Sequence, residues 1–255
     1  MMFAKKSLGQ NWLISQSAID TIVATGELGA TDTVLEIGPG QGALTKKLLA
    51  TGATVIAIEK DRELIPILEE KFAPEIKNKK LTIIEQDVLE LDSKTIGSEY
   101  KLIANIPYYL TGQIIRKFLS SKNSPTKAVL LVQKEVAERI VAKDGKNSLL
   151  SIAVKIFGEP KYIKKVPAGA FRPIPKVDSA ILLIDNINQN KLKSAGVSEE
   201  KFFAILHRGF AQKRKLLASN LKISPTVLAL CGVEEKARAE TLTVENWLCL
   251  ATKIS

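Results

Sequence analysis

The sequence predicts an α/β fold, with a doubly wound and mostly parallel sheet followed by a small all-α domain. Short apolar runs alternate with helical segments as far as residue 143, whereas every pattern after residue 198 is helical. Strands that are buried on both faces carry nearly continuous apolar runs of this kind. The alternation of strand and helix implies parallel strands joined by right-handed crossovers.

The strand candidates are five apolar, β-rich runs, at 33–37, 54–58, 81–84, 101–104 and 128–132. Between them we expect helices over 42–50, 61–72, 111–119 and 134–142. Pro66 is compatible with the second of these helices only if that helix begins close to it. The remaining elements of this part are a helix over 149–157 and two strands over 161–166 and 179–184.

A polar segment rich in Asn and Lys, residues 185–196, marks the expected boundary between a domain over 1–185 and a helical domain over 186–255. Ser198 is the expected N-cap of the first helix of the second domain. Further helices are predicted to begin at Ser224-Pro225 and Thr243-Val244.

The charge balance is basic, with 37 Lys and Arg against 27 Asp and Glu and a formal net charge of +10. This balance fits a polyanionic partner such as nucleic acid, and it also occurs in soluble proteins that bind none. No apolar stretch approaches the ~20 residues that a membrane span needs. Residues 1–7 lack the apolar run of a secretion signal. We therefore expect a cytoplasmic protein that does not bind membranes.

Two cysteines and one histidine, Cys231, Cys249 and His207, are too few to form a tetrahedral zinc site without carboxylates. No ligand spacing accompanies them, so no metal site is predicted. The cysteines lie in a region with helical patterns. We expect two reduced thiols that pack as buried apolar side chains.

A glycine-rich turn follows the first predicted strand, in the segment Glu36-Ile37-Gly38-Pro39-Gly40-Gln41-Gly42. Such a turn lets the backbone approach a ligand at the carboxyl edge of a parallel sheet, although it also occurs in ordinary tight turns. Glu59 ends the second strand, where a carboxylate can accept hydrogen bonds from both ribose hydroxyls of an adenosine ligand. Asp87 follows the third strand and can accept one from an adenine amine. Acidic residues after successive strands thus predict an adenosine-containing ligand.

The ligand predicted by these residues is either a nicotinamide dinucleotide or S-adenosylmethionine. The dinucleotide motif is Gly-x-Gly-x-x-Gly, whereas here the third glycine comes one position early and Leu44 takes its place. Glu36 would repel a pyrophosphate but would favour a sulfonium cation. Both observations favour S-adenosylmethionine.

The fourth predicted strand leads into Asn105-Ile106-Pro107-Tyr108-Tyr109. The exocyclic amine of adenine is a poor nucleophile because its lone pair is delocalised into the ring. The side-chain oxygen of Asn105 and the carbonyl oxygen of Ile106 can accept its two N–H groups. Pro107 makes the turn rigid, and Tyr108 offers a stacking face whose hydroxyl group is dispensable if stacking is its only role. Catalysis would then depend on orientation and electrostatics rather than on a strong base.

With these motifs, the sequence resembles the ribosomal RNA adenine dimethyltransferases over most of its length. Two further segments carry the resemblance. One is Lys6-Ser7-Leu8-Gly9-Gln10-Asn11-Trp12-Leu13, with Trp12 where the family usually has Phe, and the other is residues 166–180, which match Phe-x-Pro-x-Pro-x-Val-x-Ser. The resemblance implies a seven-stranded, Rossmann-like methyltransferase sheet and S-adenosylmethionine as cofactor. It also implies dimethylation of two adjacent adenines near the 3′ end of small-subunit ribosomal RNA, and a role in small-subunit biogenesis.

The resemblance further assigns site residues. It implies that the cofactor contacts Asn11, Leu13, Gly38, Glu59, Asp87 and Asn105. It implies that Phe171 closes over the target adenine opposite Tyr108, since paired aromatic rings hold flipped bases in other base-modifying enzymes. The alternative for Phe171 is a core residue that anchors the Pro-rich loop. The expected catalytic residues are Asn105, Pro107, Tyr108 and Phe171.

RNA contact is expected in the helical domain, where no acidic residue occurs between Glu200 and Glu234. The run 210–217 resembles the family's basic helix, and its cations would contact phosphates without reading sequence. The expected partner is small-subunit ribosomal RNA or the precursor of that subunit, bound by a monomer. The basic residues of the stretch are Lys201, Arg208, Lys213, Arg214, Lys215 and Lys222.

Three alternatives stay open at this point. The first is a dimethyltransferase of large-subunit ribosomal RNA of the macrolide-resistance type, which the Gly9-Gln10 start and residues 167–180 disfavour. The second is an assembly or transcription factor that keeps the fold without catalysis, which the intact Asn105 motif disfavours. The third is a DNA adenine methylase, which typically has a second proline where this chain has Ile106.

Overall fold

The computed structural model describes residue 5 and residues 8–142 and 145–254, so the sequence motif's Lys6 and Ser7, and the prediction made for the first residues, lie outside the described part. The chain forms two compact units, Met1–Ala137 with Lys161–Ile187 and Glu138–Pro160 with Asn188–Ser255. It leaves the first unit for the last time after Ile187, close to the expected boundary at residue 185. It also contributes Glu138–Pro160 to the second unit, a segment that the sequence interpretation had placed in the first domain.

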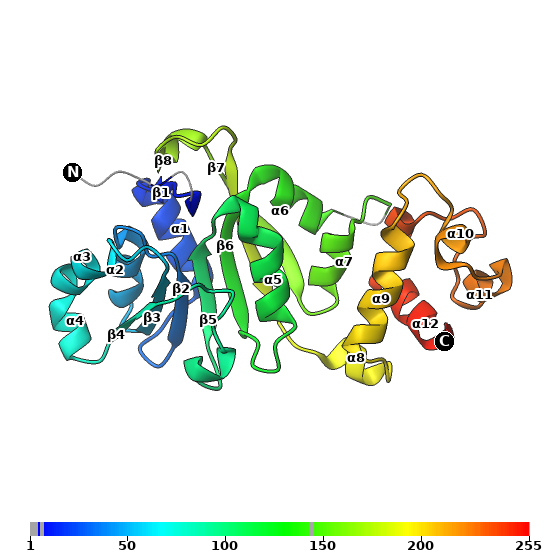
Figure 1. The fold of residues 1–255 in the computed structure, drawn as a ribbon, viewed down its shortest axis with the longest axis horizontal. Coiled ribbons are helices and arrows are strands. Elements are labelled where there is room, and N and C mark those ends of the chain that lie inside the picture. The colour runs from blue at the N-terminus through cyan, green and yellow to red at the C-terminus, as the bar shows by residue number, and fades with distance from the viewer. Residues whose placement is uncertain (1–4, 6–7, 143–144, 255) are drawn as a thin grey trace. The chain divides into compact units, whose positions relative to one another are not determined.

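The first unit contains a seven-stranded sheet with the strand order β4-β3-β2-β5-β6-β9-β7 (Figure 1). β4, β3, β2, β5 and β6 are parallel, and β9 pairs antiparallel with β6. The chain therefore runs outward from β2 to β4 and then returns to the other side of β2 as β5. Ligands of doubly wound sheets bind at such a switch point. The strands are β2 (Thr33–Ile37), β3 (Thr54–Glu59), β4 (Leu81–Glu85), β5 (Lys101–Asn105), β6 (Lys127–Gln133), β7 (Glu159–Val166) and β9 (Ser179–Asp185).

Every strand predicted in the sequence is present. The five parallel strands carry the apolar runs that suit a buried parallel sheet, whereas β7 is mostly exposed. The helix expected over 61–72 begins only at Ile65, with Pro66 in its first turn, where the fixed φ of proline is favourable. The helices assigned to this part are α1 (Gln16–Gly26), α2 (Ala43–Leu49), α3 (Ile65–Lys71), α4 (Ala73–Lys77), α5 (Thr111–Leu119) and α6 (Lys134–Val141).

A second, two-stranded sheet was not predicted. β1 (Trp12–Leu13) pairs antiparallel with β8 (Phe171–Arg172), so that Leu13 lies opposite Phe171. Strands of two residues are too short to produce a periodic pattern in the sequence. The pairing brings the N-terminal motif and the late motif of the chain together.

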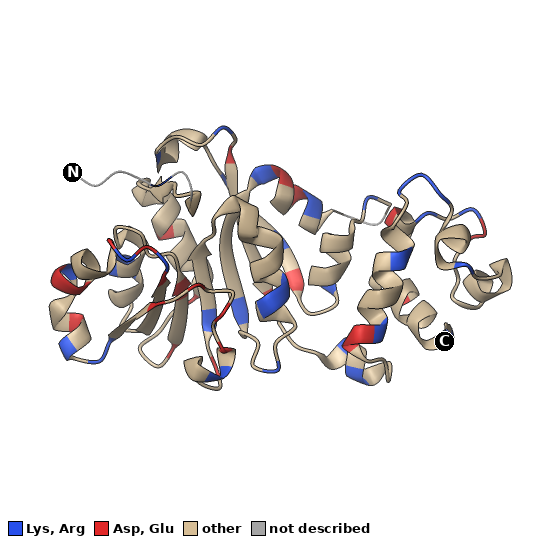
Figure 2. Ribbon diagram, in the orientation of Figure 1, with Lys and Arg blue, Asp and Glu red and all other residues tan. Residues whose placement is uncertain are grey.

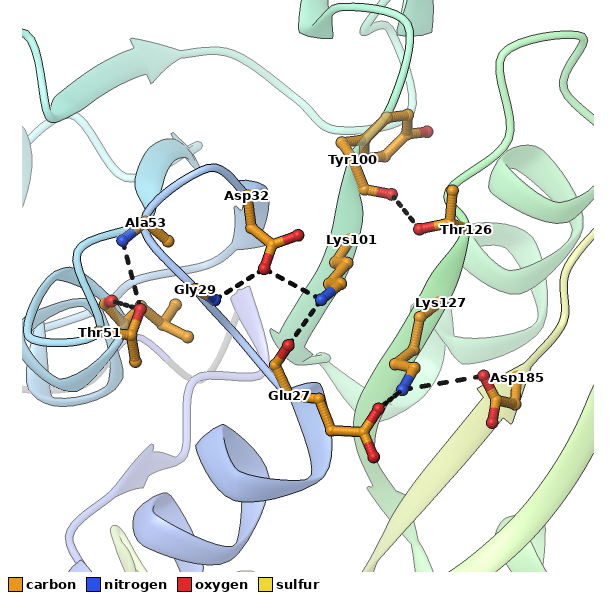
Figure 3. A network of polar contacts seen from close by, with 11 residues as sticks. Glu27, Gly29, Asp32, Thr51, Ala53, Tyr100, Lys101, Thr126, Lys127 and Asp185 are labelled. Atoms are coloured by element: carbon orange, nitrogen blue, oxygen red, sulfur yellow. Dashed lines mark hydrogen bonds and ion pairs between the residues drawn. The ribbon is translucent and has the colours of Figure 1, made fainter.

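The amino edge of the large sheet is fixed by two lysines that begin neighbouring strands (Figure 3). Lys101 of β5 donates to the carbonyl oxygen of Glu27 at 2.7 Å and pairs with Asp32 at 3.1 Å. Lys127 of β6 pairs with the Glu27 carboxylate and, at 3.8 Å, with Asp185. These contacts occupy the edge opposite to the carboxyl ends of β2, β3 and β5, where the predicted site residues lie.

Apart from turns, loops and the first two residues of β7, the described residues of the second unit are helical. Ser198 caps α9 by accepting a hydrogen bond from the Lys201 N–H group, and Thr243 caps α12 within a capping box, as the sequence predicts. Trp247 of α12 is 1% exposed and packs against Gly209 of α9. The helices are α7 (Leu149–Lys155), α8 (Asn190–Ser194), α9 (Glu199–Phe210), α10 (Leu217–Leu221), α11 (Pro225–Leu230) and α12 (Val244–Lys253).

The prediction of two reduced thiols is wrong in this structure. Cys231, which follows α11, forms a disulfide with Cys249 of α12. Asn246 donates from its side chain to the Cys231 carbonyl oxygen at 3.0 Å, which holds the end of α11 against α12. Nothing in the sequence spacing indicates that the chain folds back in this way between the two helices.

Two predicted absences can be compared with the described residues. Within them, no helix is long and apolar enough to cross a membrane. In the same part of the chain, no group of three or more His, Cys, Asp or Glu side chains could hold a metal ion.

Candidate functional site

A cavity lies at the carboxyl ends of β2, β3 and β5, at the switch point of the sheet. It encloses about 780 Å³, counting the open space at its mouth, which is within the usual range of small-molecule sites. Five segments of the first unit contribute its walls. The lining residues are Leu8, Gly9, Gln10, Asn11, Trp12, Ile37, Gly38, Gly40, Glu59, Lys60, Gln86, Asp87, Val88, Asn105, Ile106, Pro107, Tyr108, Tyr109 and Leu110.

Glu59 ends β3 at the floor of the glycine-rich turn, and its side chain is 7% exposed. One carboxylate oxygen accepts from the Gly40 N–H group at 3.2 Å, and the other accepts from the N–H groups of Lys60 and Asp61, both at 2.9 Å. Burial raises the pKa of Glu59, although these three donors favour the charged form. The residue therefore both lines the cavity and holds the turn in place.

Asp87 follows β4 and is paired with a lysine that the sequence analysis did not single out. Lys60 Nζ lies 2.7 Å from Asp87 Oδ2, and the Leu89 N–H group donates to Oδ1 at 2.9 Å. The Lys60 ammonium, followed by the Leu89 donor, holds the pKa of Asp87 below its usual value. Asp87 is thus an ionised acceptor at the cavity wall.

A segment that we call the N-terminal strap, residues 8–12, forms one wall of the cavity. Gln10 donates from its side chain to Asp61 at 2.8 Å, and Lys5 pairs with the same carboxylate at 2.7 Å. Burial alone would raise the pKa of Asp61, but the bonds from Lys5 and Gln10 outweigh it and lower the pKa. The strap is therefore tied directly to the loop after Glu59.

Two glycines give the strap its close contacts. Gly40 has a φ of +57°, and a Cβ atom there would lie 2.9 Å from the Trp12 ring. Gly9 has a φ of +62°, and a Cβ atom there would lie 2.9 Å from the ring of Tyr109. Both positions combine a left-handed backbone with an aromatic neighbour, so only glycine fits them without strain.

Asn105 is the last residue of β5, and its side chain is oriented by the strap. Its Nδ2 group donates to the main-chain carbonyl oxygen of Asn11 at 3.0 Å. This bond assigns the nitrogen of the carboxamide to the protein and leaves the Oδ1 atom as the acceptor for a ligand. The following residues Ile106, Pro107 and Tyr108 also line the cavity.

Glu36 does not lie where the sequence argument put it. It is 1% exposed within β2 and is not among the residues that line the cavity. Its carboxylate oxygens make no hydrogen bond of ordinary geometry among the described residues, although the hydroxyl and N–H groups of Thr45 lie close enough to favour the charged form. Burial raises the pKa of Glu36 to about 8, so the carboxyl group is mostly protonated at neutral pH.

The structure brings seven of the nine predicted site residues to the cavity and leaves two away from it. Phe171 and Leu13 are 0% and 6% exposed and belong to the hydrophobic core. The position of Phe171 matches the alternative of a core residue below the Pro-rich loop, and contact with an adenine would require its ring to leave the core. The residues at the cavity are Asn11, Gly38, Glu59, Asp87, Asn105, Pro107 and Tyr108.

Lys60, Gln86 and Tyr109 line the cavity without having been predicted as site residues. Each is adjacent in sequence to a predicted one, namely Glu59, Asp87 or Tyr108. Tyr109 is 60% exposed, unusual for a large aromatic side chain. Lys60 and Gln86 could have been predicted from the sequence, because each is next to an acidic residue at the end of a strand.

The basic run of the second unit forms a loop, not the helix that the resemblance implied. Residues 211–216 lie between the end of α9 and the start of α10, and Lys213, Arg214 and Lys215 are all exposed. Figure 2 shows Lys and Arg along the loop that joins these helices. Arg208 has a structural role, because its guanidinium group donates to the Leu221 carbonyl oxygen at 2.5 Å.

The residues of the cavity fit S-adenosylmethionine. Glu59 and Asp87 supply carboxylate oxygens for ribose hydroxyls and an adenine amine, and the Gly38–Gly40 turn leaves room for the backbone to approach a ligand. The Trp12 ring packs over Gly40 at the same wall, and its indole N–H group is buried without a hydrogen-bond partner among the described residues.

Comparison with known proteins identifies the family of the chain. The family model described as ribosomal RNA adenine dimethylase matches residues 1–255. Ribosomal RNA small subunit methyltransferase A of Dehalococcoides mccartyi strain CBDB1 is 45% identical, over 97% of this chain and 88% of the relative. The protein of the same name from Thermosynechococcus vestitus is 38% identical, over 98% of this chain and 97% of the relative.

Two solved structures resemble the chain along nearly its whole length. A dimethyladenosine transferase from Plasmodium falciparum has a TM-score of 0.81 and 27% identity, covering 94% of this chain and 96% of its own. The 23S rRNA methyltransferase ErmE has a TM-score of 0.77 and 26% identity, covering 96% and 99%. The chain therefore belongs to the ribosomal RNA adenine dimethylase family and is an S-adenosylmethionine-dependent methyltransferase.

Proposed function

We propose that this protein transfers methyl groups from S-adenosylmethionine to the N6 amines of two adjacent adenines near the 3′ end of small-subunit ribosomal RNA. The observation that carries the proposal is the orientation of Asn105 at the cavity, with its nitrogen bonded to the Asn11 carbonyl oxygen. The names of the relatives at 38–45% identity support the small subunit as the source of the RNA.

The cofactor would be held by residues from four strand ends and the strap. Glu59 would accept hydrogen bonds from the ribose hydroxyl groups, and Asp87 would accept one from the adenine amine. Asn11 and Gly38, which also line the cavity, would contact the rest of the cofactor. The bound cofactor supplies an electrophilic methyl group on a sulfonium centre. Lys60 lowers the pKa of Asp87 further and holds its carboxylate in place at the cavity wall.

The chemistry assigned to this chain is orientation of the target amine. Asn105 Oδ1 accepts one N–H group and the Ile106 carbonyl oxygen accepts the other, which draws the amine nitrogen towards a tetrahedral geometry and frees its lone pair. Preorganised acceptors of this kind lower the barrier without proton abstraction. No histidine lines the cavity in the described residues, and Asp87 is committed to Lys60. The product ammonium loses its proton to water after transfer.

Tyr108 supplies the stacking face for the extruded adenine, and Pro107 makes the backbone that leads into Tyr108 rigid. The exposed ring of Tyr109 lies beside the strap at the same cavity. Base–aromatic stacking contributes about 1–3 kcal/mol per base, enough to hold a flipped adenine in place. Phe171 would join this stack only after leaving its core position.

The RNA itself would be positioned by the exposed basic loop, Lys213, Arg214 and Lys215, together with Lys222. Phosphate contacts fix the register of the RNA and carry no sequence information. We propose that the protein acts as a monomer in the cytoplasm, where ribosomal subunits are assembled.

The test is a map of dimethylated adenines in ribosomal RNA from cells with and without the gene. Two adjacent adenines near the 3′ end of the small-subunit RNA should lose both methyl groups on deletion and regain them with the wild-type gene, but not with Asn105→Ala. Loss of a modified adenine in large-subunit RNA instead would assign the chain to the macrolide-resistance type of activity. An unchanged map would remove the proposed substrate altogether.

A further inference from the structure

Tyr108 and Ser179 meet at the catalytic end of the sheet, although 71 positions separate them in the sequence. Tyr108 begins the short 3-10 helix η3 (Tyr108–Leu110) after β5, and Ser179 is the first residue of β9. Their hydroxyl oxygens are 2.7 Å apart, the usual length of an O–H···O hydrogen bond. The bond joins the motif that begins at Asn105 to the residue that follows the Pro-rich segment.

Ser179 is fully buried, and Tyr108 is half-buried. Ser179 is 0% exposed, and burial raises the pKa of Tyr108, with the Ser179 bond offsetting only part of the rise. A buried tyrosine hydroxyl group nearly always has a partner, because leaving it unbonded is costly. Ser179 supplies that partner for Tyr108.

Ser179 is itself held in a fixed position. It pairs with Gln133 in the ladder between β6 and β9. The preceding residue, Asp178, accepts from the Lys134 N–H group through its main chain and from the Ala168 N–H group through its side chain, both at 2.9 Å. The hydroxyl group is thus presented from a firmly paired strand end.

The main chain of Tyr108 is fixed as well. The Leu110 N–H group donates to the Pro107 carbonyl oxygen at 2.9 Å, and the Thr111 hydroxyl group donates to the Tyr108 carbonyl oxygen at 3.1 Å. The ring, which lines the cavity, is therefore held at its backbone end by the turn and at its hydroxyl end by Ser179.

We propose that Ser179 is a positioning residue for methyl transfer, which holds the Tyr108 ring in the orientation that stacks on the target adenine. The inference rests on the stacking role proposed for Tyr108. Ser179 does not line the cavity, so it acts only through the tyrosine. Without the bond the ring has more freedom, and the adenine spends less time in the reactive geometry. The loss should fall on kcat for the RNA reaction and leave the KM for S-adenosylmethionine unchanged.

The experiment is a double-mutant cycle of Ser179→Ala and Tyr108→Phe, measured as methyl transfer to an RNA substrate. Each single variant should lower kcat about tenfold, the upper range for one hydrogen bond. The double variant should be no slower than either single variant, because both changes remove the same bond. Tyr108→Phe leaves β9 untouched, so the inference stays testable even if Ser179→Ala folds poorly.

Tyr100→Phe is the matched control. Tyr100 is 2% exposed, and its hydroxyl group donates to the Asn123 carbonyl oxygen at 3.0 Å. It precedes β5 at the amino edge of the sheet (Figure 3). Tyr108, in contrast, follows the carboxyl end of the same strand. This variant should lower the melting temperature and keep kcat.

Two results would overturn the inference. In the first, the kcat losses of Ser179→Ala and Tyr108→Phe multiply in the double variant. In the second, each single variant changes only the melting temperature, as Tyr100→Phe does. Tyr108→Ala tests the stacking role proposed for Tyr108 separately from the role of Ser179. A Tyr108→Ala variant with full activity would remove the stacking role itself, whereas a slow Tyr108→Ala beside fully active Ser179→Ala and Tyr108→Phe refutes only the role of Ser179.

Discussion

The side-chain amide of Asn105 donates to the main-chain carbonyl oxygen of Asn11 at 3.0 Å, across 94 positions of sequence. The acceptor is a backbone atom of the strap, so the bond depends on the position of the strap rather than on the Asn11 side chain. Cofactor site and target-amine acceptor are therefore built from one connected set of residues.

Asn105→Ala should lower the single-turnover rate of methyl transfer by roughly 10²–10³-fold, the loss that follows removal of one preorganised electrostatic partner. Asn105→Asp keeps an acceptor oxygen but loses the donor to Asn11, so its rate should lie between those of wild type and Asn105→Ala. The rate should show no rise with pH near neutrality. A clear ionisation in that range, abolished by one substitution, would indicate general-base catalysis instead.

Glu59→Ala should weaken S-adenosylmethionine binding tenfold or more in calorimetry, because charge-assisted hydrogen bonds contribute roughly 1.5–3 kcal/mol each. The variant also releases the Gly40 N–H group, which loosens the turn. Glu85→Ala is the control, since Glu85 pairs with Glu59 in the ladder of β3 and β4 but does not line the cavity. Equal affinities for the two variants would remove Glu59 from the cofactor site.

Replacement of Lys213, Arg214 and Lys215 by Ala should weaken RNA binding and flatten its dependence on salt. Each lost phosphate contact should reduce the slope of log affinity against log salt by roughly 0.7–0.9. Cofactor affinity should not change. Lys193 and Lys253, which are exposed on other helices of the same unit, serve as controls. An unchanged slope in the triple variant would mean that the loop does not contact RNA.

Glu36 should make the stability of the protein fall between about pH 4.5 and pH 8. Over this range an unfolded chain with the ordinary pKa of 4.5 releases the proton, while the folded protein with a pKa of about 8 retains it, so rising pH favours unfolding. The effect reaches about 5 kcal/mol at most for a shift of this size. It is absent below pH 4.5, where both states are protonated.

Melting temperatures of wild type and Glu36→Gln across this pH range check the effect. The two proteins should be similar in acid, and the variant should gain relative to wild type up to about pH 8 and no further. A constant difference at all pH values would show that Glu36 does not titrate differently on folding.

The sequence predicted the sheet well because buried parallel strands require continuous apolar runs. It also predicted Gly38, Glu59, Asp87 and Asn105 at one cavity, since the carboxyl ends of parallel strands meet at one edge. Local sequence carries both kinds of information.

Contacts between distant segments were not predictable in the same way. The pairing of Leu13 with Phe171 buries both, and it removes Phe171 from the cavity where the resemblance had placed it. The ion pair of Lys60 with Asp87 and the disulfide of Cys231 with Cys249 depend on how loops return after a strand or helix. The periodic patterns of the sequence do not predict which distant segments such loops bring together.

The second unit has a consequence for the order in which the chain folds during synthesis. In the folded protein α7 packs against α9, and Phe157 stacks on Phe203. Residues 138–160 therefore leave the ribosome before the helix that covers them. Asn147 likewise waits for the Leu242 carbonyl oxygen, 95 positions later. The nascent chain must therefore keep an apolar helix without its cover until α9 has been made. A shortened chain that ends at residue 187 would never cover it, and should aggregate even with every cavity residue present.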